Sequence, residues 1–190
     1  MNKKWYNIQG KATDAVAEVY IFDEIGAYGI TAQDFIAEMK EYKDTPVNLR
    51  INCIGGDVFD GMAMYNIIKK REAKTTAYIE GIAASMGSVI ALAADEVVMA
   101  ENSLFMIHNA WGGAMGEAED MRKTASVLEK ISGEIASIYK RKTALSLDRI
   151  TDMMDEETWL NAEEAYELGF VDTISDSIKV AAKYDVSKFK

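Results

Sequence analysis

The repeated alternation of strand and helix patterns constrains the fold of this chain more than any other feature. Segments rich in Val, Ile and aromatic residues, which are typical of strands, occupy residues 17–25, 47–53, 75–81, 96–100 and 103–110. Apolar residues at helical spacing fill the intervals 31–44, 58–72 and 83–95. Strands joined by helices form βαβ units, so the sequence predicts an α/β fold around a largely parallel sheet.

The C-terminal half is predicted to contain two further helices. The first spans about residues 117–142 and carries an apolar stripe at Met121, Ala125, Leu128, Ile131, Ile135 and Ile138. Such a stripe would be exposed on a monomer, so we expect it to pack against another subunit. The second helix, 161–172, starts with Asn161 and Glu164 in capping-box spacing and has Gly169 as its candidate C-terminal cap.

Composition indicates a soluble globular protein and narrows its function. The 190 residues, 49% apolar and 27% charged, are expected to form one domain, 1–190. No apolar run is long enough to span a membrane, and the N-terminus lacks the apolar core of a secretory signal. Cys53 is the only cysteine, which excludes an internal disulfide and favours a cytoplasmic location. The net charge of −10 argues against nucleic-acid binding.

Ser85 is the first candidate for chemistry, because it stands where a strand pattern gives way to a helix pattern in "GIAASMGSVIALAA", residues 81–94. A serine there can be a nucleophile, with the free N–H groups of the helix N-terminus ready to stabilise an oxyanion. The alternative is a serine that only caps the helix. This stretch alone leaves both interpretations open.

A serine nucleophile needs a base, and His108 is the only histidine in the chain. It ends a strand pattern and precedes "NAWGG", the kind of position where α/β folds gather functional groups. A buried, merely hydrogen-bonded histidine is the alternative. The glycines at 55–56 can supply a backbone N–H to an oxyanion or a backbone edge that pairs with the substrate. Alternatively, they form only a tight turn. They match neither a dinucleotide-binding nor a Walker-type phosphate loop.

The third member of a triad should be an acid. The stretch "MMDEETWLNAEEA" offers Asp155, Glu156 and Glu157 just before an aromatic residue, Trp159. A solvated acidic turn explains these residues equally well from local sequence.

Four blocks together resemble the Clp-type serine peptidases: "INCIGGDVFDGMAMYNII", "GIAASMGSVIALAAD", "MIHNAWGG" and "TWLNAEEAYELGFVD", within residues 47–172. The first part of the chain, "KKWYNIQGKATDAVAEVYIFDEIGAYGITAQDF", is similar to the ClpP-like head maturation proteases of phages and prophages. The family pattern places the nucleophile at Ser85, the general base at His108 and the acid at Glu157. Housekeeping members usually carry Asp at that last position, so Asp155 remains a rival.

The same resemblance implies that the backbone N–H groups of Gly56 and Met86 form the oxyanion hole. The chain departs from the family pattern before the glycines, where "NCIGG" replaces "NSPGG". The substrate is expected to lie as an added strand between the turn at 55–56 and the segment "NAWGGAMG", with Gly55, Gly56, Trp111 and Gly112 in contact. Cys53 is interpreted as a small buried residue and not as a second nucleophile.

The resemblance implies a ClpP/crotonase-like fold of stacked ββα units, in which the helix at 117–142 forms a protruding handle. It implies peptide-bond hydrolysis with no metal or organic cofactor, inside a homo-oligomeric ring that is commonly sevenfold and often stacked into a tetradecamer. The substrates would be polypeptides. Phage capsid or scaffold proteins, or an unfoldase ATPase, would be the partners, and neither nucleic acid nor a membrane is expected.

Three other functions are alternatives to peptide hydrolysis in such a ring. A crotonase-type enzyme would use backbone oxyanion donors on an acyl-CoA without a serine nucleophile. A membrane-bound signal-peptide peptidase would use a Ser–Lys pair and a hydrophobic anchor. A ring-forming structural subunit with a decayed site would hydrolyse nothing.

Overall fold

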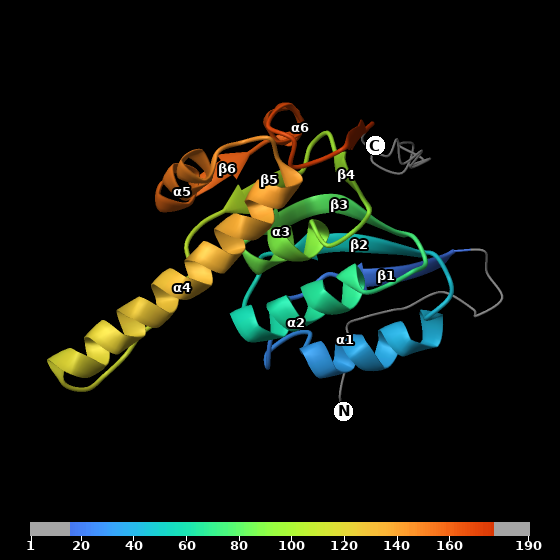
Figure 1. Ribbon diagram of the computed structural model, residues 1–190. Helices are drawn as coiled ribbons and strands as arrows, with labels where there is room; N and C mark the ends of the chain where they lie inside the picture. Colours follow the sequence, from blue (N-terminus) through green and yellow to red (C-terminus); the bar gives the residue numbers. More distant parts are fainter. Residues whose placement is uncertain (1–15, 177–190) are drawn as a thin grey trace, which may run out of the picture.

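A seven-stranded sheet forms the centre of the protein in the computed structural model, which describes residues 16–176 (Figure 1). Its strands are β1 (Ala17–Ile21), β2 (Val47–Cys53), β3 (Thr75–Ala84), β4 (Glu96–Ala100), β5 (Leu104–Ile107), β6 (Thr158–Leu160) and β7 (Thr173–Ser175). The main order is β1-β2-β3-β4-β7, and β5 pairs with the far end of β3 and with β6. Every pairing is parallel except β5 with β6, which confirms the predicted, largely parallel α/β sheet.

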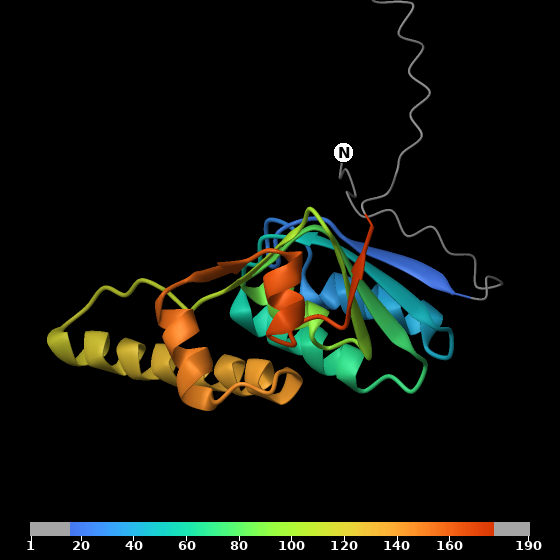
Figure 2. The same cartoon turned by 90° about the horizontal axis from the view of Figure 1, so that it is seen from above.

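The helices of the described residues are α1 (Ala32–Met39), α2 (Val58–Lys69), α3 (Met86–Ala91), α4 (Ala118–Lys142), α5 (Leu147–Asp155) and α6 (Ala162–Glu167), and a 3-10 turn, η1 (Lys40–Tyr42), follows α1. Figure 2 shows α1 and α2 on one side of the sheet. Among these helices, none is both long and apolar enough to cross a membrane.

The sheet centre and the covering helices bury the apolar residues that the sequence patterns align. In β2, Leu49 and Ile51 are fully buried, whereas the alternate residues Asn48 and Arg50 are half-buried and Asn52 is exposed. Asp57 precedes helix α2 and caps it, because its side chain accepts hydrogen bonds from two backbone amides of the first turn. Met64 and Ile68 on its inner face then pack into the core. The periodicity thus sets which face of each element is buried.

The junction before Ser85 differs from the prediction. Strand β3 runs to Ala84 instead of residue 81, and α3 begins at Met86 instead of residue 83. Ala83 is fully buried and pairs with both β2 and β5, so a small side chain fits where three strands meet. The small residues Ala83 and Ala84, which suggested a helix, therefore belong to strand β3.

Other predicted boundaries were too long at their ends. The segments at 17–25, 31–44, 58–72, 103–110 and 161–172 are ordered as β1, α1 with η1, α2, β5 and α6, each shorter than predicted. The segments at 47–53 and 96–100 coincide with β2 and β4. That residues 1–190 form a single domain stays a prediction, because residues 1–15 and 177–190 lie outside the described part.

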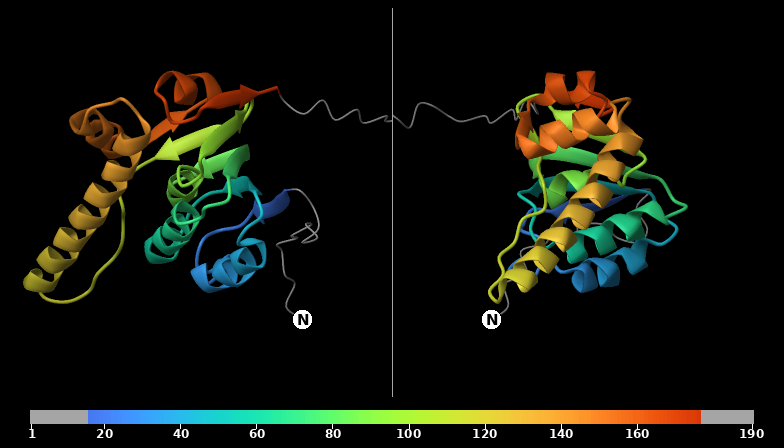
Figure 3. Two further views of the ribbon diagram at one scale, coloured as in Figure 1. Left: turned by 45° about the vertical axis from the view of Figure 1, so that its right-hand side comes forward. Right: turned by 60° about the vertical axis from the view of Figure 1, so that its left-hand side comes forward.

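Helix α4 is the predicted handle at 117–142, and it projects away from the sheet (Figures 1 and 3). The expectation that its apolar stripe is exposed on a monomer was wrong for the C-terminal half. Ile135, Ile138 and Tyr139 are buried within the same chain, whereas Met121 is 40% and Val127 49% exposed. Only the projecting half therefore presents apolar side chains to a potential neighbour.

Candidate active site

Ser85 occupies a strained turn between β3 and α3. Its φ of 53° and ψ of −125° lie outside the regions that non-glycine residues favour. The Ser85 N–H donates to the Met106 carbonyl of β5 at 3.0 Å, which fixes the turn against the neighbouring strand. The Ser85 side chain makes no cap hydrogen bond to α3. The serine is thus the residue before the helix, but it does not cap it with its hydroxyl.

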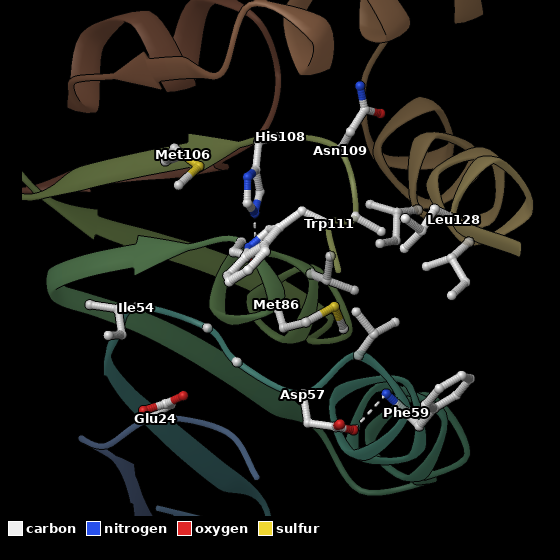
Figure 4. A pocket seen from close by; sticks show the side chains of 18 of the residues that line it. Glu24, Ile54, Asp57, Phe59, Met86, Met106, His108, Asn109, Trp111 and Leu128 are labelled. Atoms are coloured by element: carbon white, nitrogen blue, oxygen red, sulfur yellow. Dashed lines mark hydrogen bonds between the residues drawn. The ribbon is translucent and has the colours of Figure 1, made fainter. Parts of the chain in front are cut away.

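The Ser85 hydroxyl instead contacts His108. The distance between Ser85 Oγ and His108 Nε2 is 2.7 Å, a hydrogen bond of ideal length, drawn in Figure 4. His108 follows β5 directly, and the parallel pairing of Ala84 with Met106 places both strand ends at the same edge of the sheet. The His108 side chain is 17% exposed, so it remains accessible from the cleft. Two residues 23 positions apart in sequence therefore meet in the geometry of a nucleophile and its base.

The acidic residue nearest to His108 in the described residues is Glu157. Its Oε2 lies 4.0 Å from His108 Nδ1, within ion-pair range but beyond a hydrogen bond. Glu157 has a φ of 50°, and its Oε1 accepts a long hydrogen bond, 3.3 Å, from the Trp159 indole N–H. The antiparallel pairing of β6 with β5, with Thr158 opposite Ile107, brings this carboxylate to the histidine.

The rival acid faces elsewhere. Asp155 Oδ1 accepts a 2.6 Å hydrogen bond from the side-chain amide of Asn109, the residue after His108. Asp155 thereby ties the end of α5 to the loop that follows β5. The structure brings Glu157 toward the imidazole and engages Asp155 in this other contact.

The glycine turn lies against the serine. Gly55 and Gly56 both have positive φ, 98° and 139°, which explains glycine at both positions. Ile25 N donates to the Gly55 carbonyl at 2.7 Å, and Asp57 N donates to the Ile25 carbonyl at 2.8 Å. Ile25 thus pairs with the carbonyl before Gly56 and with the amide after it. In such a parallel bridge the N–H of Gly56 itself points away from Ile25, to the opposite edge of this short extended segment. That edge is open to the cleft, which Gly56 lines.

A cleft of about 460 Å³ surrounds the Ser85 and His108 pair. Its apolar wall consists of Val58, Met86, Val89, Met106, Leu128, Ile131 and Ile135. Gly55, Gly56 and Trp111 also line it, and Trp111 is 82% exposed. Gly112 is not among the lining residues, although it follows Trp111 in the loop between β5 and α4. Three of the four predicted substrate contacts thus face the cleft.

Two polar residues that the sequence analysis did not single out hold the serine turn. The Ser88 hydroxyl donates to the Ser85 carbonyl at 2.6 Å and accepts from the Tyr139 hydroxyl at 2.8 Å, since a hydroxyl has one proton to give. Both residues are fully buried, and burial raises the pKa of Tyr139, so its phenol stays protonated. This chain of hydrogen bonds links α4 to the turn that carries Ser85. The sequence offered one signal for this contact, the hydroxyl of Ser88 three residues after Ser85. Its partner, Tyr139, lies 51 residues further along the chain and could not be identified from local sequence.

Cys53 is not suited to act as a second nucleophile. Its side chain is buried, and burial raises the pKa of the thiol to about 11. The unreactive thiol form therefore dominates at neutral pH. Within residues 16–176, no group of three or more His, Cys, Asp or Glu side chains is arranged to hold a metal ion.

Gly55 gives a direct test of how tightly this site is packed. A Cβ at residue 55 would lie 2.7 Å from Ser85 Cβ and 2.9 Å from Met86 N, and φ is unfavourable for any L-residue. We expect Gly55→Ala to displace Ser85 and to lower kcat/KM for peptide hydrolysis about 100-fold, because small misplacements of reacting groups are expensive. The matched control is Gly133→Ala in α4, where a new Cβ meets nothing within 4 Å. Equal activity of both variants would contradict the proposed geometry.

Comparison with known proteins assigns this arrangement to a family. The family model described as Clp protease matches residues 2–177. The ATP-dependent Clp protease proteolytic subunit 1 of Salinibacter ruber is 31% identical over 147 residues, which are 76% of this chain and 63% of that relative. The ATP-dependent Clp protease proteolytic subunit of Deinococcus radiodurans is 28% identical over 155 residues, 80% of this chain and 76% of the relative.

A third relative, the ATP-dependent Clp protease proteolytic subunit of Bacteroides fragilis, is 31% identical over 130 residues, which are 67% of this chain and 63% of the relative. The matched part of the chain thus spans less than two thirds of the Salinibacter and Bacteroides proteins.

Proposed function

Because this chain belongs to the Clp protease family, we propose that it is a serine endopeptidase with Ser85, His108 and Glu157 as its triad. The observation that carries the proposal is the 2.7 Å hydrogen bond between Ser85 Oγ and His108 Nε2 inside an open cleft. An acyl-CoA enzyme of crotonase type would need no such serine and base pair. A Ser–Lys peptidase would need a lysine at the serine, and within residues 16–176 no lysine lines this cleft.

The proposed reaction starts with attack of Ser85 Oγ on the substrate carbonyl carbon. His108 Nε2 accepts the hydroxyl proton and later donates it to the leaving amine. The N–H groups of Gly56 and Met86 stabilise the oxyanion, to which one donor typically contributes about 10²–10³ in rate. Water then attacks the acyl-enzyme, and His108 acts again as the base. No step requires a metal or an organic cofactor.

Glu157 would hold the His108 ring and stabilise the imidazolium that forms during attack. Its 4.0 Å distance to Nδ1 has to shorten by about 1 Å to reach hydrogen-bond length. The side chain is 58% exposed, so its torsions are free to make this adjustment. Catalytic hydrogen bonds are often long before substrate binds.

The apolar wall of the cleft predicts the kind of peptide that is cleaved. Val58 from α2 and Leu128 and Ile131 from α4 line the cleft with Ser85 and are only half-buried, so they offer a surface to one large apolar side chain. We expect peptides with Leu or Met before the scissile bond to be cleaved at least about tenfold faster than matched peptides with Asp there. Hydrolysis of a quenched fluorescent peptide panel, with cleavage sites located by mass spectrometry, measures this ratio. A preference for Asp would contradict the assignment of this wall.

We propose further that the protein acts as a ring-shaped homo-oligomer, with the exposed half of α4 packed on a neighbouring subunit. Family members that form closed chambers admit extended or unfolded chains, which suits the strand-like binding between residues 55–56 and the loop after β5. A heptamer, or two stacked heptamers, is the expected assembly, in the cytoplasm. Native mass spectrometry measures the subunit number directly.

The proposed biological role is maturation of phage heads, by cleavage of capsid or scaffold precursors. It rests on the resemblance of residues 3–35, of which residues 3–15 lie outside the described part. The relatives are named as ATP-dependent proteolytic subunits, which favours an unfoldase-partnered degradation subunit as the alternative. Portal and capsid genes next to the gene of this chain would favour the first role, and an adjacent ATPase gene the second.

A further inference from the structure

The substrate cleft carries acidic side chains that have no part in the proposed triad. In the described part of the chain, its lining contains two carboxylates, Glu24 and Asp57, and one imidazole, His108, but no Lys or Arg. Figure 4 shows Glu24 and Asp57 across the cleft from His108. A peptide that binds along this turn therefore meets negative charge on one wall and an apolar surface on the other.

Glu24 is held in place by its backbone and not by its side chain. The Ile30 N–H donates to the Glu24 carbonyl, and Ile25 pairs with both flanks of Gly56, so residue 24 is fixed beside the turn. A Cβ at Gly56 would lie 3.0 Å from Glu24 Cγ, so the two residues are in contact. The carboxylate has no hydrogen-bond or ion-pair partner among residues 16–176 and remains available to a ligand.

Asp57 differs in this respect. Its Oδ1 accepts hydrogen bonds from the backbone N–H groups of Phe59 and Asp60, both at 2.9 Å, as the cap of α2. The positive end of the helix dipole compensates a large part of its charge. Glu24 is thus the carboxylate of the cleft whose charge is left without compensation.

We infer that Glu24 is a specificity-determining residue, which selects polypeptides with Lys or Arg within three residues of the scissile bond. The inference rests on the proposed peptidase function and names its substrate class. A guanidinium or ammonium group near the exposed carboxylate of Glu24 gains a charge-assisted contact. An acidic side chain at the same position is repelled.

The location of Glu24 predicts an effect on rate as well as on binding. Its side chain touches Gly56, whose N–H is a proposed oxyanion donor, and negative charge there opposes the developing oxyanion. A basic substrate side chain neutralises this charge, and removal of the charge by mutation does the same. Glu24→Gln should therefore speed the cleavage of neutral peptides while it slows the cleavage of basic ones.

The test uses the full chain and pairs of quenched peptides that differ at one position, Arg or its uncharged isostere citrulline. The varied position is placed in turn at each of the three residues before and the three residues after the cleaved bond. At one or more positions we expect kcat/KM to favour Arg about tenfold, and this preference should weaken with added salt. In Glu24→Gln the ratio should fall below about twofold, with faster citrulline cleavage than in the unchanged protein.

Two further variants make the result specific to residue 24. Glu24→Lys should reverse the preference, so that Glu peptides are cleaved faster than Gln peptides. Glu163→Gln, on exposed α6 outside the cleft, changes the net charge equally and should keep the unchanged ratio. Cleavage without any Arg preference, or a preference that survives Glu24→Gln, would overturn the inference and leave the peptidase intact. No cleavage of any peptide by the unchanged protein would overturn the peptidase proposal and this inference together.

Discussion

Replacement of Ser85 by alanine is expected to lower peptide hydrolysis by at least about 10³-fold, the largest effect of any single change in this chain. The variant removes the atom that forms the acyl-enzyme in the proposed mechanism, while the small methyl group fits the space of the hydroxymethyl. Among the described residues, Ser85 Oγ forms its hydrogen bond with His108, and the backbone N–H of Ser85 keeps its own hydrogen bond to Met106 in the variant. Both hydrolysis of an apolar peptide and labelling by a fluorophosphonate probe should disappear.

The matched control is Ser137→Ala. The Ser137 hydroxyl donates to the Gly133 carbonyl within α4, and Ser137 is not among the described residues that line the cleft. This variant should keep full activity and full labelling. Labelling that persists in Ser85→Ala would show that another side chain is the nucleophile, and the triad proposed for this cleft would be wrong.

Replacement of Glu157 by glutamine is expected to lower kcat about 100-fold with little change in KM. The neutral amide can still contact the ring, but it cannot stabilise the imidazolium that forms when Ser85 attacks. We expect a smaller loss than a tightly hydrogen-bonded acid would give, because Glu157 Oε2 starts 4.0 Å from His108 Nδ1. Steady-state kinetics on one apolar peptide separates kcat from KM.

Asp155→Asn is the matched comparison, since it makes the same chemical change two residues away. The asparagine oxygen can still accept from Asn109, so activity should stay within about threefold of the unchanged protein. Glu157→Asp is expected to retain measurable activity, because Asp keeps the carboxylate and tolerates positive φ better. A crippled Asp155→Asn with an active Glu157→Gln would reassign the acid to Asp155.

Sequence alone predicted the elements whose signals are local. Helix α4 was predicted within one residue of its observed bounds, because charged and apolar residues repeat over seven helical turns. Strands β2 and β4 were also predicted at their observed bounds. Helix α5 and strands β6 and β7 were missed, since three to nine residues carry too little periodicity to be recognised. The start of α3 was misplaced because alanine fits a helix and a crowded strand equally well.

The sequence by itself also determined the chemical types at the site, a unique histidine and a serine at a strand-to-helix boundary, whose order matches a known family. Only the tertiary structure decided which acid approaches His108, which hydroxyls brace the Ser85 turn, and that Glu24 borders the cleft. Short-range sequence sets periodicity and turns. Distances between side chains that are 23, 49 or 51 positions apart depend on strand register and helix packing, which many weak contacts across the whole core set together.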